Sequence, residues 1–109
     1  MGNVSSIILV GENLKQLRVA NNYTQQQIGE YLGVDQSLIS KIEHGERNIN
    51  MTMLEKLSLL YDILDYELLY PLKNYKAVPI QSDTIVDLNA VAKMNQVKTY
   101  LQLLRRLTQ

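Results

Sequence analysis

The segment from Thr24 to Glu43 constrains the fold most, because its residues mark two short helices and the tight turn between them. Thr24, followed three residues later by Gln27, is a capping box in which each side chain satisfies a free backbone N–H at a helix start. Gly33 is predicted to end that helix, since glycine adopts the left-handed conformation needed just past a helix without steric cost. Asp35 is a favourable N-cap for the next helix. The spacing therefore predicts two short helices joined by a turn.

Apolar residues that recur every three or four positions continue on both sides of this pair, whereas the alternation typical of strands is nearly absent. We therefore expect an all-α domain over residues 7–70. Asn50 is predicted to cap a helix after the pair, and Pro71 to end the last helix of the domain. The expected helices occupy residues 7–21, 25–32, 36–43, 51–61 and 65–70. The apolar residues expected on their buried faces are Ile7, Val10, Leu14, Leu17, Ala20, Ile28, Tyr31, Leu32, Leu38, Ile39, Ile42, Met51, Leu54, Leu57, Leu60 and Tyr61.

The rest of the chain divides into a linker and one long helix. Residues 71–82 contain both prolines and no helical period, which predicts a linker, with a short strand at residues 76–80 as the alternative. Residues 83–109 are predicted to form an amphipathic helix with Asp83 or Thr84 as its cap. The apolar stripe of this helix, at helical spacing, consists of Val86, Ala90, Met94, Val97, Leu101 and Leu104.

The composition excludes several kinds of site. The chain has no Cys, so it can form no disulfide, thiol nucleophile or Cys-based zinc site, and this fits a reducing compartment. Its single histidine, His44, has no partner at a recognisable catalytic spacing, and Asp62 and Asp65 are best explained as helix caps. No apolar run approaches the ~20 residues of a membrane span. We therefore expect a cytoplasmic protein that is not an enzyme and has no metal, no cofactor and no membrane partner.

A resemblance to the helix-turn-helix of the Cro and cI type phage repressors, and of their bacterial XRE relatives, is carried by residues 24–48, which read TQQQIGEYLGVDQSLISKIEHGERN. Gly29 is small where the two helices cross closely, and Gly33 makes the turn. The run from Lys41 to Gly45 is similar to the family's K-I-E-N-G. The resemblance covers about residues 7–70. It implies a lambda-repressor-like five-helix DNA-binding domain, which the long amphipathic C-terminal helix follows.

The resemblance implies that the second helix of the pair enters the major groove of DNA. Gln36 is the expected main base reader, because a carboxamide can pair bidentately with adenine N6 and N7. Without the motif, polar residues here would be explained as ordinary helix starts. The further expected base contacts are Ser37, Ser40 and Lys41. The expected phosphate contacts, at the start of the first helix of the pair and in the loop after the second, are Thr24, Gln25, Arg47 and Asn48.

Arg18 and Glu43 occupy positions at which relatives of this type form a partly buried ion pair between the first and third helices. The resemblance therefore implies a structural, not a catalytic, role for both residues. Removing one partner is expected to cost on the order of 3 kcal/mol, because the other is left underpaired. Loss of binding in either variant would thus not demonstrate DNA contact.

The formal net charge is zero, but the charges are unevenly distributed. Through Tyr70 there are five basic and nine acidic residues, whereas from Pro71 onward there are six basic and two acidic residues. Non-specific affinity for DNA comes from neutralised phosphates, so the acidic first part implies few phosphate contacts per half-site. We therefore expect that tight binding requires dimerisation, which doubles the contacts.

The apolar stripe of the C-terminal helix is too wide for a solvated helix on so small a protein, so it covers its own domain or another chain. Repressors of the type resembled read two-fold operators with half-sites about one helical turn, ~34 Å, apart, which favours a second copy as the partner. The sequence thus predicts a transcriptional repressor that binds a palindromic double-stranded DNA operator as a homodimer. The alternative is an antitoxin or antirepressor whose C-terminal helix binds a different protein.

Overall fold

The computed structural model describes residues 3–73, 75–78 and 87–108. Every regular element within these ranges is a helix, so the expected all-α class is confirmed. The first helix begins at residue 3 instead of residue 7, and the short helix before Pro71 is a 3₁₀ helix. In chain order the elements are α1 (Asn3–Ala20), α2 (Gln25–Leu32), α3 (Gln36–Glu43), α4 (Met51–Tyr61), the 3₁₀ helix η1 (Asp65–Leu69) and α5 (Leu88–Leu107).

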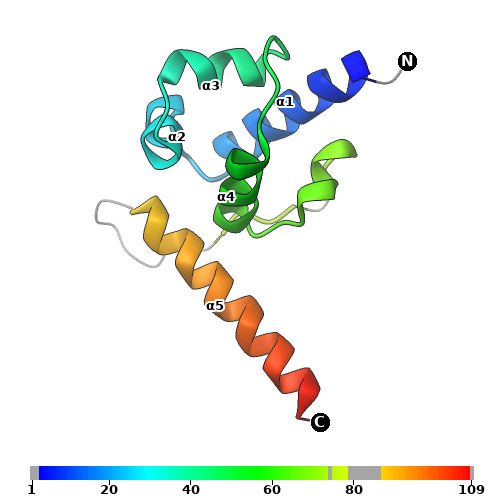
Figure 1. Cartoon of the computed structure of the whole chain (residues 1–109), viewed down its shortest axis with the longest axis vertical. Helices are drawn as coiled ribbons and strands as arrows, with labels where there is room; N and C mark the ends of the chain where they lie inside the picture. The colour runs from blue at the N-terminus through cyan, green and yellow to red at the C-terminus, as the bar shows by residue number, and fades with distance from the viewer. Residues whose placement is uncertain (1–2, 74, 79–86, 109) are drawn as a thin grey trace.

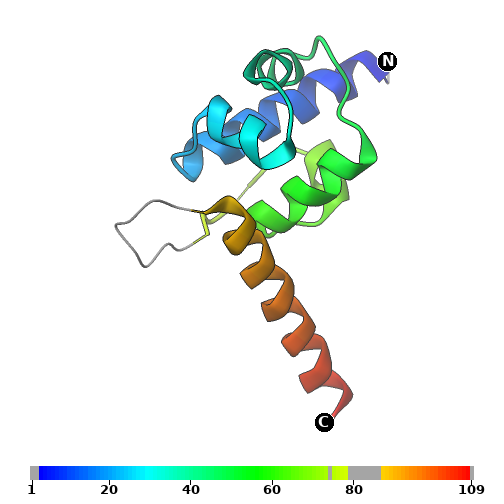
Figure 2. The same ribbon diagram turned by 60° about the vertical axis from the view of Figure 1, so that its left-hand side comes forward.

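The helices are arranged as a bundle with one long projecting arm. α1, α2, α3, α4 and η1 pack around a common centre, whereas α5 contacts α4 at its first half and then extends away from the bundle (Figures 1 and 2). α3 lies at the end of the molecule farthest from the C-terminus (Figure 1). α3 and the C-terminal end of α5 therefore lie at opposite ends of the molecule.

Local signals set the ends of the short helices as the sequence predicts. The Thr24 hydroxyl accepts from the Gln27 backbone N–H at 3.0 Å, and the Gln27 side chain accepts from the Thr24 backbone N–H at 2.8 Å. Gly33 is left-handed with φ 74°, and Asn50 caps α4 by accepting from the Met53 N–H at 2.8 Å. Asp35 takes the N-cap position of α3, but its side chain makes no capping hydrogen bond. Its contribution there is its negative charge near the positive end of the helix dipole.

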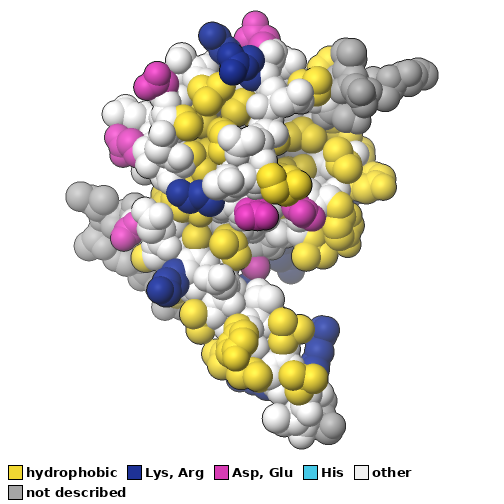
Figure 3. Space-filling model, in the orientation of Figure 1, with side chains coloured by type: hydrophobic (Ala, Val, Ile, Leu, Met, Phe, Trp, Pro, Cys, Tyr) yellow, Lys and Arg dark blue, Asp and Glu magenta, His cyan; other side chains and the backbone are white. Residues whose placement is uncertain are grey.

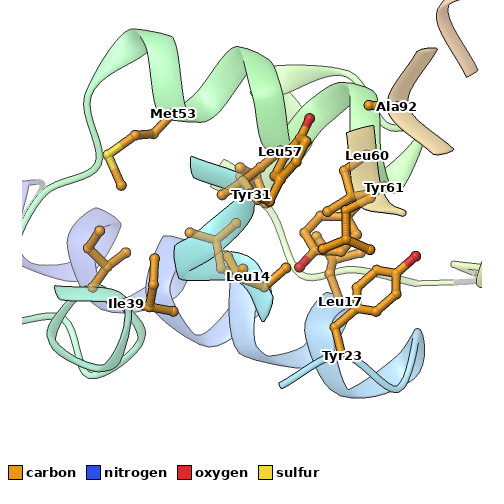
Figure 4. Close-up of a cluster of buried hydrophobic side chains, with 14 residues drawn as sticks. Leu14, Leu17, Tyr23, Tyr31, Ile39, Met53, Leu57, Leu60, Tyr61 and Ala92 are labelled. Atoms are coloured by element: carbon orange, nitrogen blue, oxygen red, sulfur yellow. The ribbon is translucent and has the colours of Figure 1, made fainter. Parts of the chain in front are cut away.

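The core lies where α1, α2 and α4 meet. Figure 4 shows side chains of α1 and α4 converging on Tyr31 of α2, and Leu17 and Leu60 are completely buried. Two residues expected in the core, Met51 and Ala20, are exposed instead. Met51 precedes the buried Met53 by two residues, which places it about 200° around α4 and away from the core. Both residues lie at a helix end, where the pattern of apolar residues continues on one side only and therefore predicts burial less well.

The described part of the linker is fastened to the bundle by one buried amide. The Asn21 Nδ2 donates to the Tyr75 hydroxyl at 2.9 Å, and the Val78 N–H donates to Asn21 Oδ1 at 3.0 Å. The Tyr75 hydroxyl in turn donates to the Tyr61 carbonyl oxygen at 3.1 Å. The alternative strand at residues 76–80 is wrong for residues 76–78, which have no strand pairing, and its last two residues lie outside the described ranges.

α5 docks on the end of α4 through polar contacts as well as apolar ones. Asn95 is buried, and its Nδ2 donates to the carbonyl oxygens of Leu59 and Leu60 at 2.7 and 3.1 Å. Lys98 pairs with Asp62, the residue that ends α4 in a left-handed conformation. α5 starts at Leu88, and the residue before it, Asp87, is its cap. The expected caps Asp83 and Thr84 lie outside the described residues.

None of the helices in the described ranges is long and apolar enough to cross a bilayer.

Candidate nucleic-acid interface

α3 turns one face to the bundle and the other to solvent. Ile39, Ile42 and Glu43 are buried against the bundle. Gln36, Ser37 and Lys41 are exposed, and Ser40 between them is half-buried. The four predicted base contacts therefore share one outward face, on a helix whose eight residues extend about 12 Å. An α-helix with its side chains is about 10–12 Å in diameter and a B-DNA major groove is about 12 Å wide, so a groove of that width admits α3.

The carboxamide of Gln25 connects the two ends of α3. Its Nε2 donates to Glu43 Oε1 at 3.1 Å, and its Oε1 accepts from Gln36 Nε2 at 3.4 Å. Gln25, predicted as a phosphate contact, is thus placed against two residues of α3, and the hydrogen bond to Glu43 holds its carboxamide in one orientation. Gln36 thus lies within hydrogen-bond reach of the Gln25 carboxamide before any ligand is present.

Arg18 and Glu43 form a two-point ion pair between α1 and α3. Arg18 Nε donates to Glu43 Oε2 at 2.7 Å, and Arg18 Nη2 donates to Oε1 at 3.1 Å. Arg18 Nη1 also donates to the Tyr23 carbonyl oxygen at 3.0 Å. The side chains are only 13% and 3% exposed. The hydrogen bond to Glu43 raises the pKa of Arg18 further above its ordinary value, so the guanidinium stays protonated.

The remaining predicted phosphate contacts lie at the two ends of the helix pair. Thr24 is exposed at the start of α2, although its hydroxyl is already engaged in the capping box. Arg47 and Asn48 are exposed in the loop after α3, beyond Gly45, whose φ is 77°. In Figure 3, basic and acidic side chains both appear on the half of the surface that contains α2 and α3. The interface is therefore polar and mixed in charge instead of strongly basic.

His44 has a structural position at the end of α3. Its Nδ1 lies 2.7 Å from the Ser40 carbonyl oxygen. Because a carbonyl oxygen only accepts, this contact requires a proton on Nδ1. The same carbonyl oxygen also accepts the His44 backbone N–H at 3.0 Å, so the ring adds a second donor to it at the C-terminal end of α3. The described residues contain no group of three His, Cys, Asp or Glu side chains arranged to hold a metal ion.

Gly11 is a residue that positions α3 and that the sequence reasoning missed. A Cβ atom at Gly11 would collide with the main-chain carbonyl oxygens of Ile42 and Glu43, at the end of α3. Gly29, expected to lie at a close crossing, would place a Cβ 2.8 Å from the Val34 carbonyl oxygen. The signal for Gly11 was available, because an isolated glycine within a helical pattern indicates close packing. The partner backbone, however, was not identifiable without the structure.

Comparisons with known proteins agree with this geometry. A helix-turn-helix family model matches residues 14–68. The HTH-type transcriptional activator BcrR of Enterococcus faecalis is 41% identical over 58 residues, a match that covers 53% of this chain and 28% of that protein. The matched segment is thus less than a third of the length of that relative. No solved structure matches the chain.

Proposed function

The chain belongs to the XRE-type helix-turn-helix family of DNA-binding transcriptional regulators, and from this premise we propose that it is a repressor that occupies a palindromic operator as a homodimer. The observation that carries the proposal is the exposed face of α3, with Gln36 at its start and in contact with the Gln25 carboxamide at 3.4 Å. An oriented carboxamide loses less conformational entropy when it pairs with adenine than a free one would.

In this proposal Gln36 reads a base, and Ser37, Ser40 and Lys41 make further contacts along the groove. Thr24, Arg47 and Asn48 contact phosphates on either side and set the register of the domain on the duplex. Gln25 has two functions, because it positions Gln36 and lies beside the N-terminus of α2, where backbone N–H groups attract an anion.

The homodimer is proposed to form through α5. The described members of the predicted apolar stripe, Ala90, Met94, Val97, Leu101 and Leu104, are all exposed, whereas Val86 lies outside the described residues. A single chain thus leaves this apolar surface in water, which is unfavourable by roughly 25 cal/mol per Å². Because each acidic DNA-binding part supplies few phosphate contacts, a second copy strengthens binding by adding a second half-site.

Substitution of Gln36 tests the assignment of the base reader. Selection of randomised duplex DNA at one fixed salt concentration is expected to enrich a palindrome. The Gln36→Ala variant is expected to lose about 1–3 kcal/mol at one base position per half-site and to accept other bases there. Gln102→Ala, a glutamine change on the exposed surface of α5, is the matched control and should select the same palindrome. Failure of the parent chain to enrich any sequence would contradict the proposed function.

The sign of regulation is tested separately, since the BcrR relative is named an activator. We favour repression because occupancy of an operator that overlaps a promoter excludes polymerase without any further contact. Expression from a reporter promoter that carries the selected palindrome is expected to fall when the chain is produced and to recover in the Gln36→Ala strain. An increase that depends on Gln36 would instead show activation and would overturn the repressor assignment.

A further inference from the structure

The second half of α5 exposes a broad apolar surface at the end of the arm. Leu107 is 81% exposed, and in Figure 3 this half of the arm shows a cluster of hydrophobic side chains with basic side chains beside it. The described part of the protein contains nothing that covers these residues. The exposed apolar side chains are Val97, Tyr100, Leu101, Leu103, Leu104 and Leu107.

A groove of about 720 Å³ lies where α5 leaves α4. Leu59, Ile63 and Leu64 supply its apolar wall, and Leu64 is 56% exposed. No Lys or Arg is among the described residues that line the groove. The carboxylates that line it are Glu55, Asp62, Asp65 and Glu67. The groove is therefore apolar inside and acidic at its edge.

We propose that this groove is filled by the end of α5 from a second copy of the chain. The occupant must present apolar side chains flanked by positive charge, because the groove pairs an apolar wall with an acidic edge. The end of α5 has this pattern, with Leu103 and Leu107 on one face and Arg106 next to them around the helix, whereas Arg105 lies on the opposite face. The inference rests on the proposed homodimer and specifies which surfaces form it.

The length of α5 fits a symmetric arrangement. If two α5 helices cross antiparallel at Tyr100, residue 107 of one copy lies beside residue 93 of the other, about 10 Å from the crossing. That level is next to Asn95, which is hydrogen bonded to the end of α4 beside the groove. The same contact then occurs twice, so both grooves are filled and the assembly closes as a dimer.

This contact adds a face of α5 that adjoins the stripe predicted by periodicity. Tyr100, Leu103 and Leu107 are centred about 100° around the helix from the stripe that contains Met94 and Leu101. Tyr100 and Leu103 themselves line the groove, so the tail of the partner packs beside them. The groove, and not the regularity of the spacing, selects this face.

Cross-linking between two differently substituted chains tests the arrangement, and the absence of cysteine provides a clean background. One full-length chain carries Leu64→Cys in the groove, and the other carries Leu107→Cys at the end of α5. Both positions are largely exposed in the single chain, so both variants are expected to fold. After the two are mixed and oxidised, the covalent 64–107 heterodimer is expected to be the main product. Val19→Cys, exposed on α1, replaces Leu64→Cys in the control mixture.

Sedimentation of the unmodified chain separates the possible failures. A dimer that gives the 64–107 product at least ten times faster than the 19–107 control supports the proposal. A dimer without that preference overturns the groove contact and leaves the proposed homodimer intact. A chain that stays monomeric at every concentration overturns both. As a second measurement, Arg106→Glu is expected to weaken the dimer on the order of 10-fold at low salt. An unchanged dimer affinity would contradict the role given to the acidic edge.

Discussion

Replacing Glu43 by Ala is expected to lower the free energy of unfolding by about 3–5 kcal/mol. The change leaves the Arg18 guanidinium, which is 13% exposed, without the carboxylate that accepts two of its hydrogen bonds. It also removes the acceptor that orients Gln25. Chemical denaturation followed by circular dichroism measures the loss. Because total stabilities of small domains are commonly 5–15 kcal/mol, the variant is expected to be only marginally folded at 25 °C.

Glu46→Ala is the matched control, since Glu46 is an exposed glutamate three residues further along the chain. Its effect on stability is expected to remain within about 0.5 kcal/mol. At a low temperature at which the Glu43→Ala variant is still folded, that variant should bind the selected palindrome more weakly, because Gln25 has lost its hydrogen bond to Glu43, but should keep the base preference that Gln36→Ala loses. A destabilisation below about 1 kcal/mol would show that the Arg18 pair is screened by water and does not hold α3 to α1.

Replacing Gly11 by Ala tests the closest approach between α1 and α3. Helix propensity alone predicts a gain of about 1 kcal/mol for this change within α1. The new methyl group, however, would collide with two main-chain carbonyl oxygens, which cannot rotate away as a flexible side chain can. Overpacking of this kind costs about 1–3 kcal/mol or more, so we expect net destabilisation of about 2 kcal/mol and displacement of α3. Thermal unfolding measures the first effect, and DNA affinity measures the second.

Glu12→Ala provides the comparison for Gly11→Ala, because Glu12 is the next residue of α1 and is exposed. It adds a strong helix former without any collision, so its effect should lie within about 0.5 kcal/mol. A Gly11→Ala variant that is more stable than the parent would mean that α1 and α3 have room to separate, and the steric argument would then be wrong.

The short helices were predictable because their signals are local. The capping box at Thr24 and Gln27, the left-handed Gly33 and the cap at Asn50 each act within one turn of chain, and the structure confirms all three. At Asp35 the sequence predicted the position of the cap but not its chemistry, since a side-chain hydrogen bond depends on a rotamer that packing selects.

The candidate site was only partly predictable. Periodicity and the family resemblance place Gln36 and Lys41 together on the exposed face of α3, because positions on one helix have a known angular relation. The link from Gln25 to Gln36 joins residues of two helices, so it depends on how α2 and α3 cross. The same holds for Asn95, an ordinary polar residue in the sequence that proves to be buried and bonded to α4.

By itself, the sequence determined the all-helical class, the bounds of the helix pair and the family, because capping, turn geometry and periodicity act between near neighbours in the chain. Only the tertiary structure decided which faces meet. It brought the backbone of α3 against Gly11, and it divided α5 into a half that docks on α4 and a half that remains uncovered. Those outcomes depend on contacts between residues far apart in the chain, and an apolar stripe along one helix does not specify which surface will bury it.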